Sequence, residues 1–404
     1  QPRRVAATTV CRRVCDERGC RVGEEVGYAV RFDAKRKENV TAVTFATDGY
    51  LLREAIGDPD LSQYRVIILD EAHERSTQTD ILCGLAKRAA LERRARRLRQ
   101  RHHPLTVVAM SATVDAAQYA AFFGVDLTAV ITAPGRAHPV DVFYSKRPQQ
   151  DYASTAARAV LQLLDDPTAH GDVLVFMPGQ EEILALARRL THDLATTTTQ
   201  ALHNHNNNNN KSSLLTNKDA IDGTNPGDDR GTQRVDVLPL YAAMSRDEQR
   251  AVFAQHQPMS RRRKVVIATT IAETSVTIPG VRHVVDPGLV KARRVSAKTG
   301  LESLEVTATS KAQAKQRAGR AGREAPGRCY RLYPESEFLA LPRQRPPDIE
   351  QTDLASVMLQ LKAIGIRDPR AFDYVSKPPR DALQRAFETL VALGAVAPTE
   401  DLAL

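Results

Sequence analysis

Three side chains near residue 320 have the types and the spacing of a phosphate-binding surface. A helix over residues 311–323 places Gln316, Arg320 and Arg323 at i, i+4 and i+7, which is one helix face. The two guanidinium groups keep their charge and match phosphate oxygens, and the amide can hold a water molecule. Glycines at 319 and 322 add no side chain, so another group can approach closely. A solvated basic helix is the alternative, although two glycines are costly in an exposed helix.

A second group of reactive residues follows a short apolar run. Residues 64–69 are rich in β-branched side chains, which is typical of a buried parallel strand, and they lead directly into Asp70-Glu71-Ala72-His73. Ligands of open α/β sheets bind beyond the carboxyl ends of the strands. We therefore predict that Asp70 and Glu71 serve the Mg²⁺ of a nucleotide and that Glu71 polarises an attacking water. A strand followed by an ordinary acidic turn is the alternative.

Four apolar segments of this kind lead into polar turns. They comprise residues 66–69, 105–110, 172–176 and 264–268. The second leads into Ser111-Ala112-Thr113. Helical segments fall between the four, which predicts βαβ units and parallel sheets. Residues 133–139 contain two prolines and a glycine and read as a linker, so we expect two sheets rather than one.

Three other regions have a distinct composition. Residues 191–234 contain a threonine run and five consecutive asparagines, which predicts a disordered surface insertion. After Pro346-Pro347, two amphipathic helical segments predict a small helical module. Residues 91–103 are strongly basic and could form a solvated helix face, a nucleic-acid contact or a nuclear-import patch, of which we favour the first.

Composition restricts the class of protein further. The 404 residues are enough for two or three domains, and a hydrophobic share of 42% is ordinary for a globular protein. A net charge of +9 favours a polyanionic partner, and no apolar stretch reaches membrane-spanning length. The odd number of cysteines, five, favours a reducing compartment. The chain opens at Gln1 without an initiator methionine, so we expect it to be a fragment.

Taken in chain order, these motifs resemble the DEAH-box (DEAH/RHA) ATP-dependent RNA helicases of superfamily 2. The matching stretches are residues 1–7, 26–32, 47–49, 70–73, 111–113, 179–182, 268–275 and 316–323. Further similarity at 143–152 and 354–360 points to a nucleolar subgroup. The resemblance implies an α/β fold with two tandem RecA-like domains, at 1–136 and 137–345, followed by the start of a winged-helix domain at 346–404. The insertion at about 191–234 would then belong to the second RecA-like domain.

The resemblance implies nucleotide-site roles, with ATP or another NTP and Mg²⁺ as cofactors. Catalysis and the metal would be served by Asp70 and Glu71, with His73 coupling to the second domain. Gln316 would position the attacking water, and Arg320 and Arg323 would bind the transferring phosphoryl group from across an interdomain cleft. The remaining roles fall on Arg13 and Phe253, which would sandwich the base, on Ser275 as γ-phosphate sensor, and on Ser111 and Thr113 as coupling residues.

RNA is the partner that the resemblance implies. The matching contact residues are Arg3, Arg4, Arg31, Thr47, Gln180 and Thr270. Arginine, hydroxyl and amide groups suit phosphate and sugar contacts, which carry no sequence information. A hairpin at 291–304, with Lys298 and Gly300 at its turn, would separate strands. An activator protein is a further expected partner, and a membrane is not. The expected location is the nucleus or nucleolus, with the cytoplasm as the alternative.

Two departures from the family pattern affect the expected activity. No G-x-x-x-x-G-K-[ST] loop occurs in the chain, so triphosphate binding should be weak and the fragment inactive. Thr270 and Pro279 stand where family members often carry Asn and Asp, which affects an RNA and a ribose contact. The favoured function is an NTP-driven RNA helicase that moves 3′ to 5′ on single-stranded RNA. The alternatives are a non-catalytic RNA-binding helicase relic and a DNA helicase.

Overall fold

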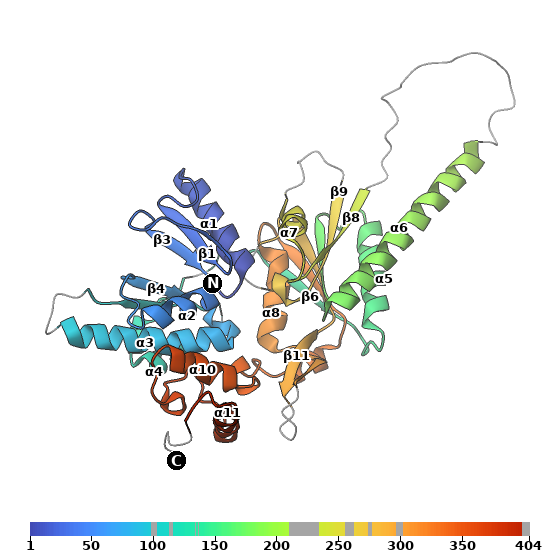
Figure 1. The fold of residues 1–404 in the computed structure, drawn as a ribbon. Coiled ribbons are helices and arrows are strands. Elements are labelled where there is room, and N and C mark those ends of the chain that lie inside the picture. The colour runs from blue at the N-terminus through green and yellow to red at the C-terminus, as the bar shows by residue number, and fades with distance from the viewer. Residues whose placement is uncertain are drawn as a thin grey trace. The chain divides into compact units, whose positions relative to one another are not determined.

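The chain is organised in two units, whose elements Figure 1 shows coloured along the sequence. The first comprises Gln1–Pro134, Ala292–Glu305 and Arg345–Leu404, and the second comprises Gly135–Lys291 and Val306–Gln344. The computed structural model describes residues 1–97, 103–112, 116–133, 135, 137–209, 234–254, 262–273, 277–295 and 302–397. Within these ranges, no helix is both long enough and apolar enough to cross a membrane.

A six-stranded parallel sheet forms the centre of the second unit, in the order β6-β13-β10-β7-β9-β8. Figure 1 labels its strands β6, β8 and β9. Its strands are β6 (Val140–Tyr144), β7 (Asp172–Phe176), β8 (Arg234–Leu240), β9 (Arg262–Ala268), β10 (Val281–Asp286) and β13 (Gly327–Arg331). The predicted strands 172–176 and 264–268 are the neighbours β7 and β9, and β9 begins at Arg262. The prediction of an α/β fold with parallel sheets is confirmed for this unit.

Helices cover both faces of this sheet because its central strands are apolar on both sides. Val173 and Val175 of β7 pack in one cluster with α5 and α6, whereas Leu174 and Phe176 pack in the other with α7 and α8. The helices of this unit are α5 (Tyr152–Asp165), α6 (Gln180–Asn209), α7 (Arg246–Phe253), α8 (Lys311–Gly319) and α9 (Glu335–Ala340), with short 3₁₀ helices η3 (Thr270–Ala272) and η4 (Arg320–Gly322).

Helix α6 corrects part of the predicted insertion. Disorder was predicted from residue 191, but the helix continues to Asn209. Residues 191–209 contain no glycine or proline that would end it. Thr191 and Thr196 also donate their hydroxyls to the carbonyls of Ala187 and His192, 2.9 and 3.2 Å away, so these polar side chains satisfy helix carbonyls. Residues 210–233 lie outside the described residues.

The first unit contains two smaller sheets. Their strands are β1 (Val26–Val30), β2 (Asp33–Lys35) and β3 (Val43–Ala46) in the order β2-β1-β3, and the parallel pair β4 (Val66–Leu69) and β5 (Thr106–Ala109). The helices before residue 134 are α1 (Arg4–Arg18), α2 (Asp48–Gly57), α3 (Thr77–Arg97) and α4 (Ala116–Phe123), with 3₁₀ helices η1 (Ala72–Glu74) and η2 (Leu127–Ala129). Cys11 and Cys15 lie together on α1 in the core, and burial raises the pKa of Cys11 to about 12.

Strand β4 differs from its predicted environment. It was expected to be buried on both faces, but only Ile67 and Leu69 are buried, whereas Val66 and Ile68 are 52% and 54% exposed. Val108 of β5 is likewise 39% exposed. The pair β4–β5 therefore has one face in the core and one apolar face in solvent among the described residues. The basic segment after residue 91 is also only partly solvated, since buried Arg93 donates to the carbonyls of Leu61 and Tyr64.

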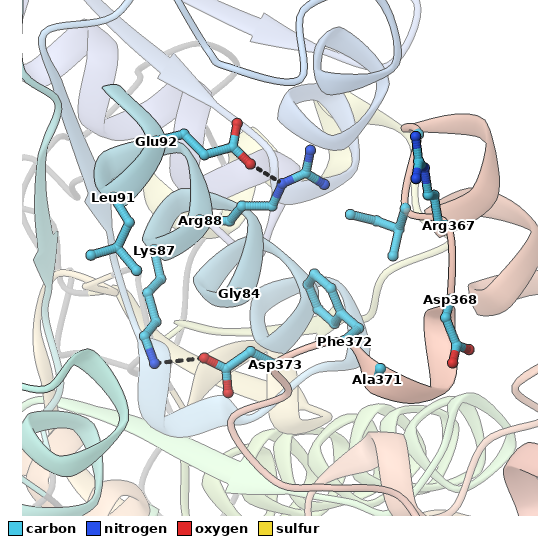
Figure 2. A pocket seen from close by; sticks show the side chains of 12 residues that line it. Gly84, Lys87, Arg88, Leu91, Glu92, Arg367, Asp368, Ala371, Phe372 and Asp373 are labelled. Atoms are coloured by element: carbon cyan, nitrogen blue, oxygen red, sulfur yellow. Dashed lines mark hydrogen bonds and ion pairs between the residues drawn. The ribbon is translucent and has the colours of Figure 1, made fainter. Parts of the chain in front are cut away.

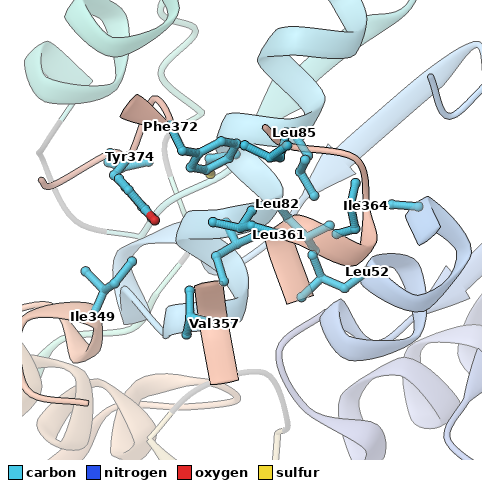
Figure 3. Close-up of a cluster of buried hydrophobic side chains, with 14 of the residues drawn as sticks. Leu52, Leu82, Leu85, Ile349, Val357, Leu361, Ile364, Phe372 and Tyr374 are labelled. Atoms are coloured by element: carbon cyan, nitrogen blue, oxygen red, sulfur yellow. The ribbon is translucent and has the colours of Figure 1, made fainter. Parts of the chain in front are cut away.

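The C-terminal residues of the first unit pack on α3. Their elements are η5 (Asp348–Glu350), α10 (Ala355–Ala363), η6 (Pro369–Ala371) and α11 (Arg380–Ala392). Figure 3 shows Leu82 and Leu85 of α3 next to Leu361 and Ile364, in one cluster that also contains Leu52 of α2. The two predicted helices are present as α10 and α11. A separate winged-helix domain from 346 onward stays a prediction, because these residues share their core with α2 and α3.

The predicted hairpin at 291–304 corresponds to a two-stranded sheet. It consists of β11 (Leu289–Val295) and β12 (Glu302–Ala308). Residues 296–301, which include the predicted turn at Lys298 and Gly300, lie outside the described residues. Its role in strand separation stays a prediction.

Candidate active site

The acidic loop forms where β4 ends, as the sequence predicts. Asp70 and Glu71 follow Leu69 directly, and η1 begins at Ala72. The parallel neighbour β5 ends beside it, and the amide of Ala72 donates to the carbonyl of Met110, 2.9 Å away. Glu71 has a left-handed backbone with a φ of 53°, an uncommon conformation for a residue with a side chain. The loop is therefore a specific, hydrogen-bonded structure at the carboxyl end of a parallel strand pair.

His73 links this loop to the Ser111-Ala112-Thr113 motif. The ring Nδ1 accepts a hydrogen bond from the Ala112 backbone amide at 3.2 Å. In a neutral imidazole the proton is then on Nε2. Nε2 lies 3.4 Å from Oε2 of Glu71. The histidine thus joins the predicted base to one predicted coupling motif through a defined tautomer. Ser111 is exposed in this turn, and Thr113 lies outside the described residues.

The carboxylate of Asp70 suits a Mg²⁺ ion bound together with phosphates. Its Oδ1 accepts the Glu71 amide at 2.8 Å and its Oδ2 accepts the Gln1 side-chain amide at 2.6 Å. A carboxylate has about four acceptor positions, so both oxygens keep capacity for a metal. The described residues contain no group of three or more His, Cys, Asp and Glu that could hold a metal. Mg²⁺ is commonly bound by one or two carboxylates, with phosphates and water as the other ligands, and Asp70 and Glu71 fit that pattern.

The arginine-bearing stretch departs from the predicted continuous α-helix. Helix α8 ends at Gly319, and Arg320–Gly322 continue as the 3₁₀ helix η4, which has a tighter turn. Gln316 is half-buried, Arg320 is buried and Arg323 is exposed. The tighter 3₁₀ turn rotates the last side chains about the helix axis. Gln316, Arg320 and Arg323 therefore share one helix face only approximately.

Only one of the two glycines in this stretch has the close neighbour that the sequence predicts. A Cβ on Gly322 would lie 2.5 Å from the His138 carbonyl oxygen, so β6 and the residues before it pack directly on η4. Gly319 has nothing within 4 Å of such an atom. The neighbour at 322 is therefore the protein's own chain.

Arg317 is a buried residue whose role the sequence did not reveal. Its Nε donates to Glu273 at 2.7 Å and its Nη1 donates to Asp286 at 2.7 Å, while Nη2 donates to the Leu289 carbonyl at 3.2 Å. Burial alone would lower the pKa of Arg317, but the carboxylates of Asp286 and Glu273 raise it above its usual range. This guanidinium anchors α8 to β10 and to the residues before Thr274, so it is a support rather than a phosphate ligand.

Two of the predicted RNA contacts line one cavity of about 510 Å³ in the first unit. The lining residues are Arg31, Phe32, Thr47, Gly49, Tyr50, Arg53, Ile56, Gln78 and Gln360. Phe32 is 84% exposed, and the Arg31 guanidinium lies 4.8 Å from its ring centroid. Thr47 is the N-cap residue of α2, yet its hydroxyl makes no capping bond. The sequence did not indicate Gln360, because this residue of α10 is far from the motifs along the chain.

The other predicted RNA contacts do not line this cavity. Arg3 pairs with Glu74 of η1 at 3.3 Å, and Arg4 is exposed at the start of α1. In the second unit, Gln180 is exposed at the first turn of α6. A Cβ on the preceding Gly179 would lie 2.6 Å from Nζ of Lys291, which pairs with Glu182. Thr270 begins η3.

The predicted base-binding pair is divided between the two units. Arg13 is exposed on α1 and pairs with Glu17, whereas Phe253 ends α7 and packs partly on the core of the second unit. Ser275, the predicted γ-phosphate sensor, lies outside the described residues. The base-binding role of these residues stays a prediction.

A second cavity, of about 560 Å³, lies between α3 and residues 365–373 and contains none of the predicted site residues (Figure 2). Figure 2 shows two ion pairs in its wall: Lys87 of α3 pairs with Asp373 at 2.6 Å, and Arg88 pairs with Glu92 of the same helix at 2.7 Å. A Cβ on Gly84 would lie 2.5 Å from the Phe372 ring. The cavity therefore marks a close joint between α3 and the C-terminal segment.

Comparisons with known proteins show the family of the chain. The chain is 42% identical over 401 residues to ATP-dependent RNA helicase DHX33 of Mus musculus, across 99% of this chain and 52% of that protein. It is 40% identical over 410 residues to the probable ATP-dependent RNA helicase DHX35 homolog of Caenorhabditis elegans, across 100% of this chain and 50% of that protein. The DEAH/RHA helicase HrpB of Escherichia coli has a similar structure, with a TM-score of 0.79 and 31% identity, across 100% of this chain and 45% of that one. The chain belongs to the DEAH/RHA family of superfamily 2 helicases.

This DEAH/RHA chain corresponds to only part of its relatives. It spans about half the length of the relatives that it matches. Residues 229–325 match the helicase conserved C-terminal domain, which covers β8 to η4. The predicted DEAH-box family and the α/β fold with RecA-like sheets are confirmed. In this DEAH/RHA chain, the acidic loop thus lies in the first unit and the matched arginine stretch in the second.

Proposed function

We propose that this chain is the motor portion of an NTP-dependent RNA helicase that couples ATP hydrolysis to translocation on single-stranded RNA. The observation that carries the proposal is the hydrogen-bonded acidic loop: His73 lies between the Glu71 carboxylate, 3.4 Å away, and the Ala112 amide, 3.2 Å away. An acid–base residue joined in this way to a second polar turn suits hydrolysis that is coupled to a conformational change.

The proposed chemistry assigns separate tasks to the two units. Glu71 would accept a proton from the attacking water, and Asp70 would hold Mg²⁺, which neutralises charge on phosphate oxygens when it is bound. Gln316 would orient the water. Arg320 and Arg323 would bind the transferring phosphoryl group, where arginines contribute about 10³–10⁵-fold in turnover. The 404-residue chain contains no G-x-x-x-x-G-K-[ST] loop, so we propose that it does not hydrolyse NTP by itself.

Hydrolysis in the complete gene product tests this proposal against its two rivals. RNA should stimulate NTP turnover more than single-stranded DNA of the same length. An RNA-binding helicase relic predicts RNA binding without any turnover, and a DNA helicase predicts that DNA stimulates more. The 3′ to 5′ direction would be measured on duplexes with a single-stranded tail at either end. From the family resemblance we also propose a nuclear location and an activator protein. Imaging would test the location, and co-purification would test the activator.

The cavity lined by Arg31, Phe32 and Thr47 predicts that two substitutions affect RNA binding by the 404-residue chain differently, one through the affinity and one through its salt dependence. Phe32→Ala should weaken binding of a single-stranded oligoribonucleotide by about 1–3 kcal/mol, because a base loses its stacking surface. Arg31→Gln should instead reduce the salt dependence, with the slope of log K against log salt falling by about 0.7 for one lost phosphate contact. Titrations at several salt concentrations would measure both effects.

Arg18→Gln is the matched control for these variants. Arg18 is an exposed arginine of the same unit that pairs with Glu25 at 2.7 Å and lies outside the cavity, so its loss should leave both quantities unchanged. Equal affinity of the Phe32→Ala and parent chains would contradict the stacking role. A binding constant that does not depend on salt would contradict phosphate contacts as a whole.

A further inference from the structure

Arg75, which directly follows the acidic loop, donates several side-chain hydrogen bonds. Its guanidinium donates from Nε and Nη2 to the two carboxylate oxygens of Asp80, each at 2.9 Å. Nη2 also donates to the Ser376 hydroxyl at 2.8 Å, and Nη1 donates to Gln118 at 3.3 Å. Asp80 is fully buried; burial raises its pKa, and the Arg75 guanidinium opposes that rise. The two parallel hydrogen bonds to Asp80 fix the orientation of the Arg75 guanidinium, and the carboxylate balances its charge.

The backbone of Arg75 ends the turn that Glu71 begins. Both residues have left-handed backbones, with φ of 53° at Glu71 and 52° at Arg75, and η1 lies between them. Such conformations cost about 1–3 kcal/mol each in residues with side chains and persist only where the surroundings enforce them. The Arg75 amide closes the turn on the Ala72 carbonyl at 3.2 Å. The positions of the Glu71 and His73 side chains therefore depend on how firmly Arg75 is held.

Two of the groups that hold Arg75 come from the C-terminal segment of the same unit. Besides Ser376, the backbone amide of Asp348 donates to the Arg75 carbonyl at 3.1 Å. That segment is itself tightly packed on α3, through Phe372 against Gly84 and the pair of Lys87 with Asp373 (Figure 2). An element packed on α3 thus reaches the acidic loop from residues more than 270 positions away along the chain.

We propose that Arg75 is a positioning residue that connects the C-terminal segment, residues 348–376, to the acidic loop and so holds Glu71 and His73 in their working geometry. The part of this inference that concerns catalysis rests on the proposed function. The structural part does not, because it concerns the order of the loop in the chain without nucleotide. Movement of the C-terminal segment would then change the hydrolysis site without any contact to the nucleotide.

Asp348→Pro removes one of these links with little other change. Proline lacks the amide that donates to Arg75, and residue 348 is the first position of a 3₁₀ helix, where proline is favoured. The preceding Pro347 already has the extended conformation that a following proline requires, with φ of −55° and ψ of 142°. Asp348→Ala is the matched control, since it removes the same side chain and keeps the amide.

Hydrogen exchange of the 404-residue chain, without nucleotide, measures the effect. The amides of Ala72, Glu74 and Arg75 are hydrogen-bonded in the loop and should be protected in the parent. In Asp348→Pro their exchange should be about fivefold faster than in Asp348→Ala, which corresponds to one net hydrogen bond. Arg75→Lys, which keeps the charge and loses the fork, should have a larger effect in the same direction. Equal exchange in the proline and alanine variants would overturn the proposal.

Turnover in the complete gene product is the second measurement. Asp348→Pro should lower kcat several-fold relative to Asp348→Ala and leave KM for NTP unchanged, because the nucleotide contacts themselves are intact. A merely structural loss would lower the melting temperature and the active fraction without this split between kcat and KM. A parent enzyme without turnover would refute the proposed function only, since the exchange measurement stands independently of it.

Discussion

Glu71→Gln should abolish NTP hydrolysis in the complete gene product and leave nucleotide binding nearly unchanged. The amide keeps the shape of the side chain and an oxygen that can accept from Nε2 of His73, which lies 3.4 Å from the carboxylate. It cannot accept a proton from water at neutral pH. Loss of a positioned general base typically costs about 10²–10⁴-fold in rate. Steady-state turnover with saturating RNA would measure the loss, and binding of a fluorescent nucleotide analogue would measure the affinity.

Glu74→Gln is the control in the same turn. Glu74 pairs with Arg3 at 3.3 Å and is the third residue of η1, so the variant removes a neighbouring negative charge without touching the predicted base. It should retain most of the turnover. If Glu71→Gln also kept its turnover, Glu71 would have no role as base, and the hydrogen bond between His73 and the Ala112 amide would be structural only.

The chemical residues of this protein could be predicted because they follow strands. Continuous β-branched runs marked β4, β7 and β9, and polar residues directly after such runs must lie at the carboxyl edge of a parallel sheet. The acidic loop was located on that basis alone. Its detailed geometry was not, because the left-handed conformation of Glu71 depends on Arg75, and Arg75 depends on Ser376, 301 residues later. A contact of that separation leaves no local signal in one sequence.

The direction in which each side chain of a helix points could be predicted less well than the ends of strands. The spacing of the arginine stretch placed Gln316, Arg320 and Arg323 on one face, but it gave no reason to separate Arg317 from them. Arg317 can be buried because its guanidinium donates hydrogen bonds to two buried carboxylates, Glu273 and Asp286. Composition misled in a similar way at α6: a run of threonines suggested disorder, although nothing in it breaks a helix.

The burial of Arg317 leads to the largest expected effect on stability. Arg317→Ala should destabilise the second unit by about 3–5 kcal/mol, because the carboxylates of Glu273 and Asp286 lose their shared counter-charge inside the protein. Their side chains are only 4% and 0% exposed, so water cannot replace the guanidinium without opening the core. In a unit of this size the loss corresponds to a fall in melting temperature on the order of 10 °C. Thermal unfolding of the 404-residue chain would measure it.

Arg323→Ala separates this supporting role from catalysis. Arg323 is exposed, so its loss should leave the melting temperature within about 1 °C of the parent while it lowers turnover in the complete gene product. A triple variant, Arg317→Met with Glu273→Gln and Asp286→Asn, should recover most of the stability, because it removes the buried charges together and keeps the carbonyl acceptors for Gln313 and for the Gly288 amide. Unfolding of Arg317→Ala at the same temperature as Arg323→Ala would mean that the buried charges are compensated elsewhere. Arg317 would then have no supporting role in the stability of the second unit.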